Sequence, residues 1–192
     1  MASTTKQQLG AALKEMMAVK PIERITIKDI TEICGVNRQT FYYHFDDVYD
    51  LLEWVFEEDA SRVLPREVVY DHWRDDVMVF FEYLYENRSF ALNVYNSHSR
   101  IYMLRFYRNA LEVCIRSFAD IVAKNMAIER SDFEFVIEFY VDGIVGLITM
   151  WLDNNMQLPP TITKERFIRM LDNSVENMLA RFKANPDVPT VR

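Results

Sequence analysis

Residues 25–56 constrain the fold of this chain more than any other stretch, because they fix where two consecutive helices begin and end. Thr26 stands three residues before Asp29, a spacing typical of a capping box at the start of a helix. Gly35 suits the left-handed conformation that ends a helix. Asn37 can then cap a second helix over residues 37–45. The stretch therefore predicts two short helices joined by a tight turn.

Both helices are expected to bury one apolar face, because apolar residues recur in them at helical spacing. In the first helix these residues are Ile27, Ile30, Ile33 and Cys34. In the second helix Phe41 and Phe45 are predicted to be buried, and the opposite side carries Arg38, Gln39, Thr40, Tyr42, Tyr43 and His44. A short second helix with such a face is typical of the recognition helix of a helix-turn-helix, which lies in the major groove of DNA.

The same residues resemble the DNA-binding signature of TetR-type transcriptional regulators. In that family a Thr opens the second helix, a Gly-Val turn follows, and the recognition helix ends in Thr-x-Tyr-x-His-Phe. This chain has Thr26, Gly35-Val36 and residues 40–45 at those places. The resemblance implies an all-α fold, with a three-helix DNA-binding domain at residues 1–46 and a helical regulatory and dimerisation domain at residues 47–192.

The chain departs from the family pattern at two places. Asn37 stands where Ser or Ala is usual, and it keeps the capping function. Val48 stands where the family usually has a Lys that meets a phosphate, and Asp46 and Asp47 precede it. These departures leave open an alternative function, in which the protein has the same fold but acts as a protein-interaction co-regulator with weak DNA binding.

The predicted DNA-binding residues are Thr26, Lys28, Asn37, Arg38, Gln39, Thr40, Tyr42, Tyr43 and His44. Arg38 and Gln39 occupy the first turn of the recognition helix, where Arg can pair with guanine and Gln with adenine. The resemblance implies that Lys28 and Tyr43 also reach bases, and that the remaining hydroxyl and imidazole groups bind phosphate, which fixes register. The alternative is a surface helix whose Tyr and His side chains merely pack.

Composition supports long helices in the rest of the chain, because half of the residues are apolar and only four are Gly and six Pro. About nine helices are expected in total. A capping box at Thr5 opens the first helix, another at Ser131–Glu134 opens a helix to about residue 153, and Thr163 caps the last helix. Residues 153–163 are predicted to form a loop, and the tail from Asn185 is expected to fray.

The charge of the chain is uneven along the sequence. Residues 1–45 contain six basic and four acidic residues, whereas the remainder contains 16 basic and 25 acidic ones, which gives the formal net charge of −7. A basic N-terminal segment on an acidic body is compatible with DNA binding, because only the docking face meets phosphate. A chance local excess is the alternative.

A homodimer is expected, because one recognition helix reads only a few base pairs. By resemblance, the interface lies on the helices near residues 132–153 and 163–183. Gly143 and Gly146 would let a partner helix approach closely, or they could instead pack a neighbour within the same subunit. The last helix adds Met170, Ser174 and Met178 at spacings of four.

The resemblance also implies an effector, which is either a small molecule or a protein. Ten aromatic residues of the body could line a ligand cavity or could simply form the core: Trp73, Phe81, Tyr83, Tyr85, Phe90, Tyr95, Tyr102, Phe106, Tyr107 and Trp151. The candidate polar anchors are Asn93, Asn96, His98 and Arg105. Residues 39–42 and 51–56 resemble the subgroup that activates dihydroxyacetone kinase operons, whose members act with a protein partner, so activation as well as repression is open.

Other function classes lack their sequence signatures. No phosphate-binding loop, nucleophile elbow or zinc-protease motif is present, and Cys34 and Cys114 show no metal or redox spacing. We therefore expect no enzyme activity, no cofactor and no metal site. The most apolar run, residues 135–152, is interrupted by Glu138 and Asp142, so a cytoplasmic protein without a membrane segment is expected.

Overall fold

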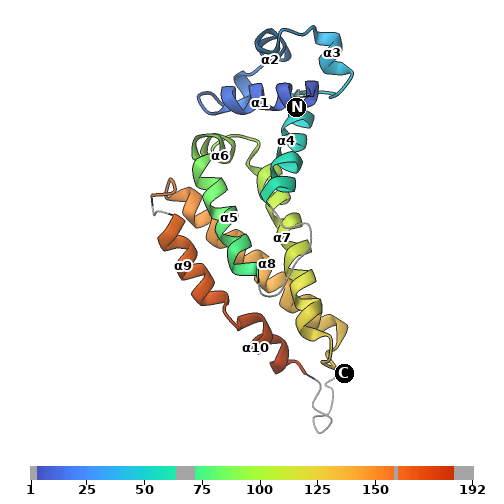
Figure 1. Cartoon of the computed structure of the whole chain (residues 1–192), viewed down its shortest axis with the longest axis vertical. Helices are drawn as coiled ribbons and strands as arrows, with labels where there is room; N and C mark the ends of the chain where they lie inside the picture. Colours follow the sequence, from blue (N-terminus) through green and yellow to red (C-terminus); the bar gives the residue numbers. More distant parts are fainter. Residues whose placement is uncertain (1–3, 64–71, 158–159, 184–192) are drawn as a thin grey trace. The chain divides into compact units, whose positions relative to one another are not determined.

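The computed structural model describes residues 4–63, 72–157 and 160–183 (Figure 1). The all-α fold predicted from the sequence is confirmed: across these ranges there is no strand, only an isolated bridge between Ile128 and Lys183. The helices are α1 (Thr5–Met17), the 3-10 turn η1 (Ile22–Arg24), α2 (Ile27–Cys34), α3 (Arg38–Tyr42), α4 (Val48–Val63), α5 (Trp73–Glu86), α6 (Arg88–Tyr95), α7 (Arg100–Ala123), α8 (Arg130–Asp153), α9 (Pro160–Leu171) and α10 (Ser174–Arg181).

The single helix expected over residues 163–183 is divided into α9 and α10. Asn173 has a φ of 56°, in the left-handed region where a helix cannot continue. Asn tolerates this conformation better than most residues, because its short polar side chain can bond locally. This break accounts for the difference between about nine predicted helices and the α1–α10 of the described ranges.

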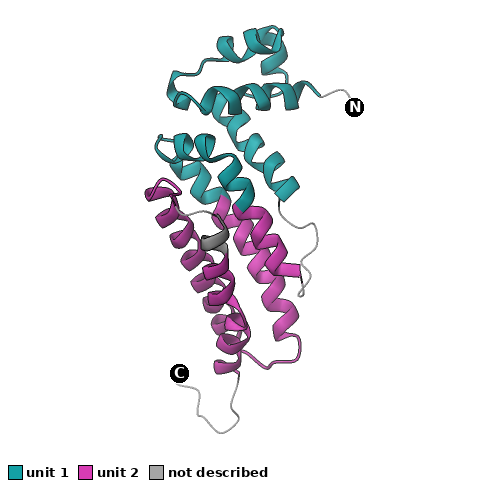
Figure 2. Ribbon diagram, turned by 60° about the vertical axis from the view of Figure 1, so that its left-hand side comes forward, with its two compact units in different colours: residues 1–65, 82–106 teal, residues 66–81, 107–192 magenta. Residues whose placement is uncertain are grey.

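The chain divides into two compact units, coloured separately in Figure 2. Unit 1 comprises residues 1–65 and 82–106, and unit 2 comprises residues 66–81 and 107–192. Residues 82–106, which the sequence placed in the regulatory domain, thus cluster with the N-terminal helices.

The core of unit 1 is built around α1, which packs against α2, α4 and α6. Eight apolar residues of α1 and α4 are buried: Leu9, Leu13, Met16, Met17, Leu51, Leu52, Val55 and Phe56. Burying each such side chain contributes about 1.5–3 kcal/mol. Gly10 allows the close approach of α1 to α4, because a Cβ there would lie 2.8 Å from Cζ3 of Trp54.

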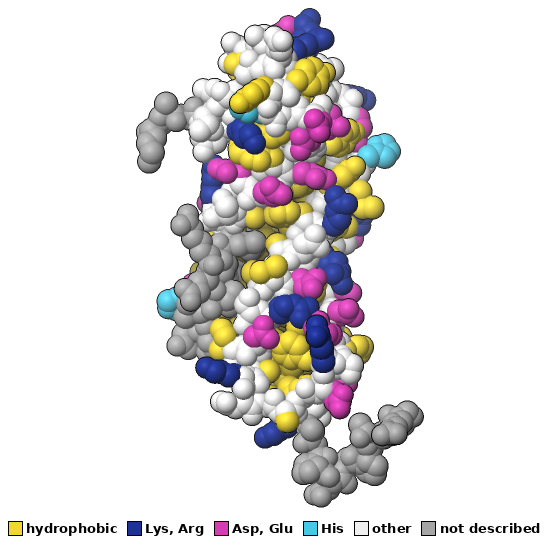
Figure 3. Space-filling view, turned by 90° about the vertical axis from the view of Figure 1, so that its right-hand side faces the viewer, with side chains coloured by type: hydrophobic (Ala, Val, Ile, Leu, Met, Phe, Trp, Pro, Cys, Tyr) yellow, Lys and Arg dark blue, Asp and Glu magenta, His cyan; other side chains and the backbone are white. Residues whose placement is uncertain are grey.

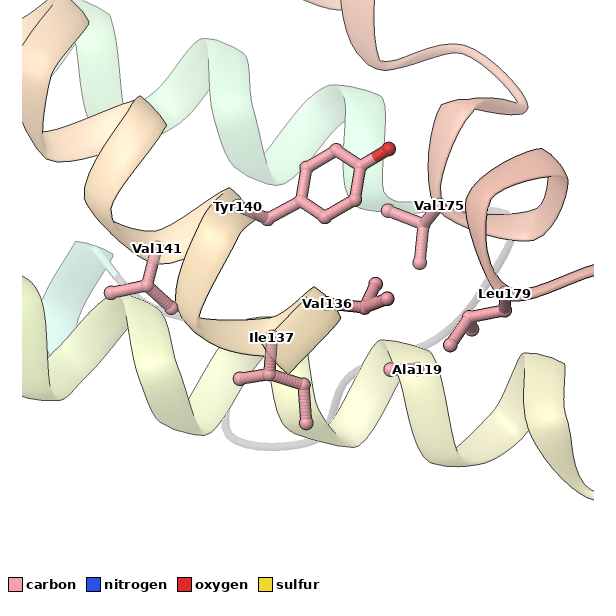
Figure 4. Packing of buried hydrophobic residues seen from close by; sticks show 7 residues of the cluster. All are labelled: Ala119, Val136, Ile137, Tyr140, Val141, Val175 and Leu179. Carbon is pink, nitrogen blue, oxygen red and sulfur yellow. The ribbon is translucent and has the colours of Figure 1, made fainter. Parts of the chain in front are cut away.

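The core of unit 2 joins α7, α8 and α10 (Figure 4). Its buried members are Ala119 of α7, Val136, Ile137, Tyr140 and Val141 of α8, and Val175 and Leu179 of α10. Phe81 of α5 adds a second contact region, since its ring lies 5.4 Å from that of Trp151 and 5.3 Å from that of Phe167. Several of the aromatic residues considered for a ligand cavity are therefore core residues.

Some predicted helix starts were wrong by a few residues. Thr4, rather than Thr5, caps α1, and its capping box is completed by Gln7. The box predicted at Ser131 is not used, because α8 begins one residue earlier and its N-cap, Glu129, makes no side-chain cap. α9 begins at Pro160, a position that suits proline because the first amides of a helix need no partner, so Thr163 lies inside the helix. The tail from Asn185 lies outside the described residues.

α8 is, across the described ranges, the one helix long and apolar enough to cross a membrane by length and composition. The core helix of a globular unit passes the same test, and eight α8 residues are buried in the structure: Val136, Ile137, Tyr140, Val141, Ile144, Ile148, Trp151 and Leu152.

Candidate nucleic-acid interface

The turn between α2 and α3 has the geometry that the sequence predicted. The Asp29 amide donates to Thr26 Oγ1 at 3.2 Å, and the Thr26 amide donates to Asp29 Oδ2 at 2.9 Å. Hydrogen bonds to the Asp29 carboxylate from the Thr26 amide and hydroxyl, together with nearby Lys20, hold the pKa of Asp29 below its usual value. Gly35 ends α2 with a φ of 64°.

The buried face of α2 differs from the predicted stripe at one position. Ile30 is buried and Ile27 is partly buried, but Ile33 is 56% exposed. At about 100° per residue, Ile33 points more than 90° away from the centre of the face that contacts α1. Thr31 lies on that face instead, and its hydroxyl donates to the carbonyl oxygens of Ile27 and Lys28.

The predicted recognition helix is shorter than residues 37–45. Asn37 is the N-cap, and its Oδ1 accepts from the Thr40 amide at 2.8 Å and from the Thr40 hydroxyl at 3.1 Å. The helix α3 ends at Tyr42, and a turn closed by the His44 amide and the Phe41 carbonyl oxygen follows. Phe41 and Phe45 are buried as predicted, so they attach α3 to the rest of unit 1.

The opposite side of α3 is directed to solvent. Arg38 and Gln39 are exposed, and neither side chain has a hydrogen-bond or ion-pair partner in the part of the chain that the structure describes. Tyr42 is exposed, Tyr43 is 84% exposed, and the Tyr43 ring meets the His44 ring edge-on at 4.9 Å. Figure 3 shows apolar and charged side chains intermixed on one face of the molecule. The exposed face of α3 thus combines a guanidinium, an amide and two phenols.

Two further predicted residues lie at the start of α2. Thr26 Oγ1 accepts one hydrogen bond from the Asp29 amide, and the Thr26 hydroxyl also bonds to the Asp29 carboxylate. Lys28 pairs with Glu32 at 3.5 Å, but both side chains are more than 60% exposed. An exposed ion pair of this kind contributes little to stability, so Lys28 can exchange Glu32 for another anion.

The start of α4 is occupied by the chain's own carboxylates. Asp47 Oδ1 accepts from the amides of Tyr49 and Asp50 at 2.7 and 2.9 Å. Asp50 Oδ2 accepts from the Asp46 amide at 2.9 Å. Val48 is buried. This end of α4 therefore presents acidic groups rather than the phosphate-binding Lys that the family resemblance implied.

Three candidate effector-pocket residues instead contact the N-terminal helices within unit 1. The Tyr83 hydroxyl lies 3.1 Å from Lys14 Nζ, His98 contacts Glu23, and Arg105 Nη2 donates to Glu53 at 3.0 Å. No local sequence pattern could have shown these contacts, since they join residues 52 to 75 positions apart.

α8 carries an exposed stripe in addition to its buried face. The stripe, which we call the α8 stripe, consists of Phe135, Phe139, Gly143, Gly146 and Met150. These spacings of three and four place all five residues on one side of the helix. A Cβ built on either glycine meets no described atom within 4 Å, so the glycines do not pack against a neighbour within the described part of the subunit.

The residues of the last helices expected at the dimer interface differ in exposure. Met170 of α9 is exposed, but Met178 of α10 packs against the core of unit 2. The Ser174 hydroxyl donates to the Leu171 carbonyl oxygen.

No group of three or more His, Cys, Asp or Glu side chains in the described ranges could hold a metal ion. Both cysteines are free, and burial raises the pKa of each thiol, with Asp76 adding to the effect at Cys114.

Two family models match the chain. Residues 9–55 match the model described as bacterial regulatory proteins, tetR family, and residues 71–173 match the model described as a transcriptional regulator C-terminal region. Together they cover the α2–α3 turn and most of the helices that follow it.

Among curated proteins, the chain is 29% identical over 91 residues to the HTH-type dhaKLM operon transcriptional activator DhaS of Lactococcus lactis. That alignment covers 47% of this chain and 49% of the relative, so the chain spans about half the length of the curated relative it matches. A solved structure of a dihydroxyacetone kinase operon activator DhaS matches with a TM-score of 0.71 at 19% identity, over 94% of this chain and 98% of the other. The fatty acid degradation regulator FadR from Bacillus halodurans matches with a TM-score of 0.63 at 15% identity, over 89% and 96%. These two structural matches establish a shared fold.

Proposed function

Since the chain belongs to the TetR family of bacterial regulatory proteins, we propose that it controls transcription by binding a palindromic DNA operator as a homodimer. In this proposal α3 enters the major groove and the α8 stripe forms the centre of the dimer interface. The family is one of transcription regulators, so no catalytic step is assigned to any residue.

The outward face of α3 is the observation that carries the proposal. Its Arg38 and Gln39 side chains are exposed and unpartnered in the described ranges. On the opposite side of the helix, Phe41 and Phe45 are buried and pack it against the rest of unit 1. Arg38 is assigned to guanine, because a guanidinium can donate to both major-groove acceptors of that base, and Gln39 to adenine, because an amide can both donate to and accept from its edge.

The other predicted contacts are assigned by the groups they leave available. Tyr42 offers a hydroxyl proton, the Thr26 hydroxyl can exchange the Asp29 carboxylate for a phosphate oxygen, and Asn37 offers its amide nitrogen, because its oxygen already accepts from Thr40. These donors suit phosphate oxygens, which position the protein without reading sequence. Lys28, Thr40, Tyr43 and His44 complete the proposed DNA-contacting set.

A dimer supplies the second recognition helix. Two-fold related helices in successive major grooves lie about 34–36 Å apart, which matches the spacing of palindromic half-sites. The α8 stripe supports this arrangement, because exposed Phe and Met side chains favour burial and Gly143 and Gly146 leave room for a partner helix. Met170 on α9 extends the same proposed surface.

We assign DNA reading to residues 1–46, and dimerisation and regulation to residues 47–192, in a cytoplasmic protein. The similarity to a dhaKLM operon transcriptional activator supports activation as one mode of regulation. The effector is proposed to be a small molecule or a protein partner that acts on the regulatory helices.

A second candidate function is a co-regulator that acts mainly through protein contacts. Asp46, Asp47 and Asp50 favour it, because their carboxylates stand at the start of α4 and would repel phosphate. Both candidates share the fold, and they differ in the affinity for DNA.

The experiment is a fluorescence anisotropy titration of the purified protein with the DNA upstream of its own gene, at two salt concentrations. The proposal predicts a discrete site with two-fold symmetry, bound more weakly as salt rises because phosphate contacts release counterions. A random duplex of equal length is the control. Equal affinity for both duplexes would refute operator recognition and favour the co-regulator.

A further inference from the structure

Lys14 occupies an unusual position for a lysine, because most of its side chain is buried on the packed side of α1. Its ammonium lies 2.8 Å from Oδ2 of Asp59 on α4 and 3.1 Å from the hydroxyl of Tyr83 on α5. It also stands over the ring of Phe90 on α6, at 5.5 Å from the centroid. One amine therefore meets residues of unit 1 that come from three other helices. We call these four residues the Lys14 node.

Because the Lys14–Asp59 pair is largely buried, the Lys14 node favours one spacing of the helices that carry it. Asp59 is only 8% exposed, and removing an ion from water is costly unless a partner and further hydrogen bonds compensate. The ammonium satisfies Asp59 and Tyr83 only while α1, α4 and α5 keep their present spacing. The face of the Phe90 ring adds attraction that also depends on position. An aliphatic residue at position 14 could fill the volume but could not impose this spacing.

α1 in turn supports the helices that carry the proposed DNA contacts. It packs against α2, and α2 packs against α3. Lys6 of α1 stands over the Phe45 ring at 5.2 Å, and Cys34 Sγ lies 3.5 Å from the Gln8 carbonyl oxygen. A change in how α1 sits on α4–α6 is therefore transmitted to α3.

We infer that Lys14 is a positioning residue, which holds the recognition helix at a fixed place relative to α4–α6. The inference rests on the proposed function, since it assigns Lys14 to operator binding without any contact to DNA. A single α3 can dock into one half-site whatever the pose of α1 on α4–α6. Simultaneous docking of two α3 helices requires that each be held at a defined separation.

The test compares a duplex containing the full palindrome with a duplex containing one half-site. Lys14→Met is expected to lower the affinity for the full palindrome about tenfold, the effect of losing one buried charged interaction. Its affinity for the half-site should stay within a factor of about two, because the surface of α3 is unchanged. Tyr83→Phe keeps the ring and removes only the hydroxyl. It should also lower the affinity for the full palindrome, by a smaller factor than Lys14→Met does. The charge-matched control is Lys20→Met, which removes a cation that is 35% exposed from the same unit and should leave the ratio of the two affinities unchanged.

Equal losses on both duplexes would leave the affinity ratio unchanged, and they would show that Lys14 only stabilises the folded protein and does not position α3.

If the wild-type protein bound neither duplex, the proposed function would fail. The inference would then be decided by a distance measurement that needs no DNA. Two spin labels are attached to cysteines introduced by Arg38→Cys and Glu86→Cys, which are exposed positions of unit 1. The native cysteines are removed by Cys34→Ser and Cys114→Ser, so that they are not labelled. Lys14→Met should broaden the distance distribution between the two labels, and an unchanged distribution would overturn the inference.

Discussion

Arg38 and Tyr42 lie one helical turn apart on the exposed face of α3, but their side chains can act on DNA in different ways. A guanidinium can make two bonds to one guanine, so its contribution depends on the base sequence. A phenol hydroxyl that donates to phosphate contributes equally to any sequence.

Arg38→Ala is therefore expected to cost about 1–3 kcal/mol of binding free energy on the operator and much less on random DNA. Tyr42→Phe should weaken binding to the operator and to random DNA by a similar factor. Competition titrations with both duplexes measure the difference. Equal effects of Arg38→Ala on operator and random DNA would count against its base-reading role.

Gly35 determines whether the turn before α3 can form, because its φ of 64° disfavours residues that have a Cβ. Gly35→Ala should lower the free energy of unfolding by about 1–2 kcal/mol, measured by urea denaturation. A Cβ at this position meets no described atom within 4 Å, so the cost comes from the backbone conformation rather than from a clash. A variant as stable as the wild type would show that the turn relaxes to another conformation.

At the level of the element, α2 depends on its capping box. Bonds from the Thr26 amide and hydroxyl lower the pKa of Asp29. A carboxyl whose pKa is lower in the folded than in the unfolded state stabilises the fold above its unfolded pKa, and this contribution is lost as pH falls through the folded value.

The stability advantage of the wild type over Asp29→Asn should therefore shrink between about pH 5 and about pH 3. Urea midpoints of both proteins across this range measure this advantage. The difference between the two midpoints removes the contribution of the carboxyl groups that both proteins share. An advantage that grew on acidification would contradict the proposed role of Asp29.

Short-range signals allowed most elements to be predicted, whereas long-range contacts could not be. The Thr26 box, the Gly35 stop and the Asn37 cap each depend on residues within a few positions of one another, and all three are present in the structure. Ile33 was misassigned because periodicity alone does not fix the centre of a buried face. The break at Asn173 has no glycine or proline to mark it, and the Lys14 node joins residues up to 76 positions apart along the sequence.

At the level of the whole molecule, operator binding as proposed requires two subunits. Gly146 has open space beside it in the described part of its own subunit, so a larger side chain there should leave the subunit fold intact. At the centre of a close helix–helix contact the same side chain would force the partner away.

Gly146→Leu is therefore expected to shift the protein from dimer to monomer in sedimentation equilibrium, with its helical circular dichroism retained. Ala11→Leu, which adds bulk to an exposed position on α1, is the matched control and should leave the dimer unchanged. A Gly146→Leu protein that remained dimeric would exclude the α8 stripe as the interface.

The central claim is that the exposed face of α3 reads the major groove, and methylation protection tests it most directly. Dimethyl sulfate modifies guanine N7, which lies in the major groove, where Arg38 is proposed to bind. The account predicts protected guanines in two symmetric half-sites, with protection lost in Arg38→Ala while Tyr42→Phe, at saturating protein, keeps the same pattern. DNA bound at high affinity with no guanine protected, or with the wild-type pattern in Arg38→Ala, would contradict it.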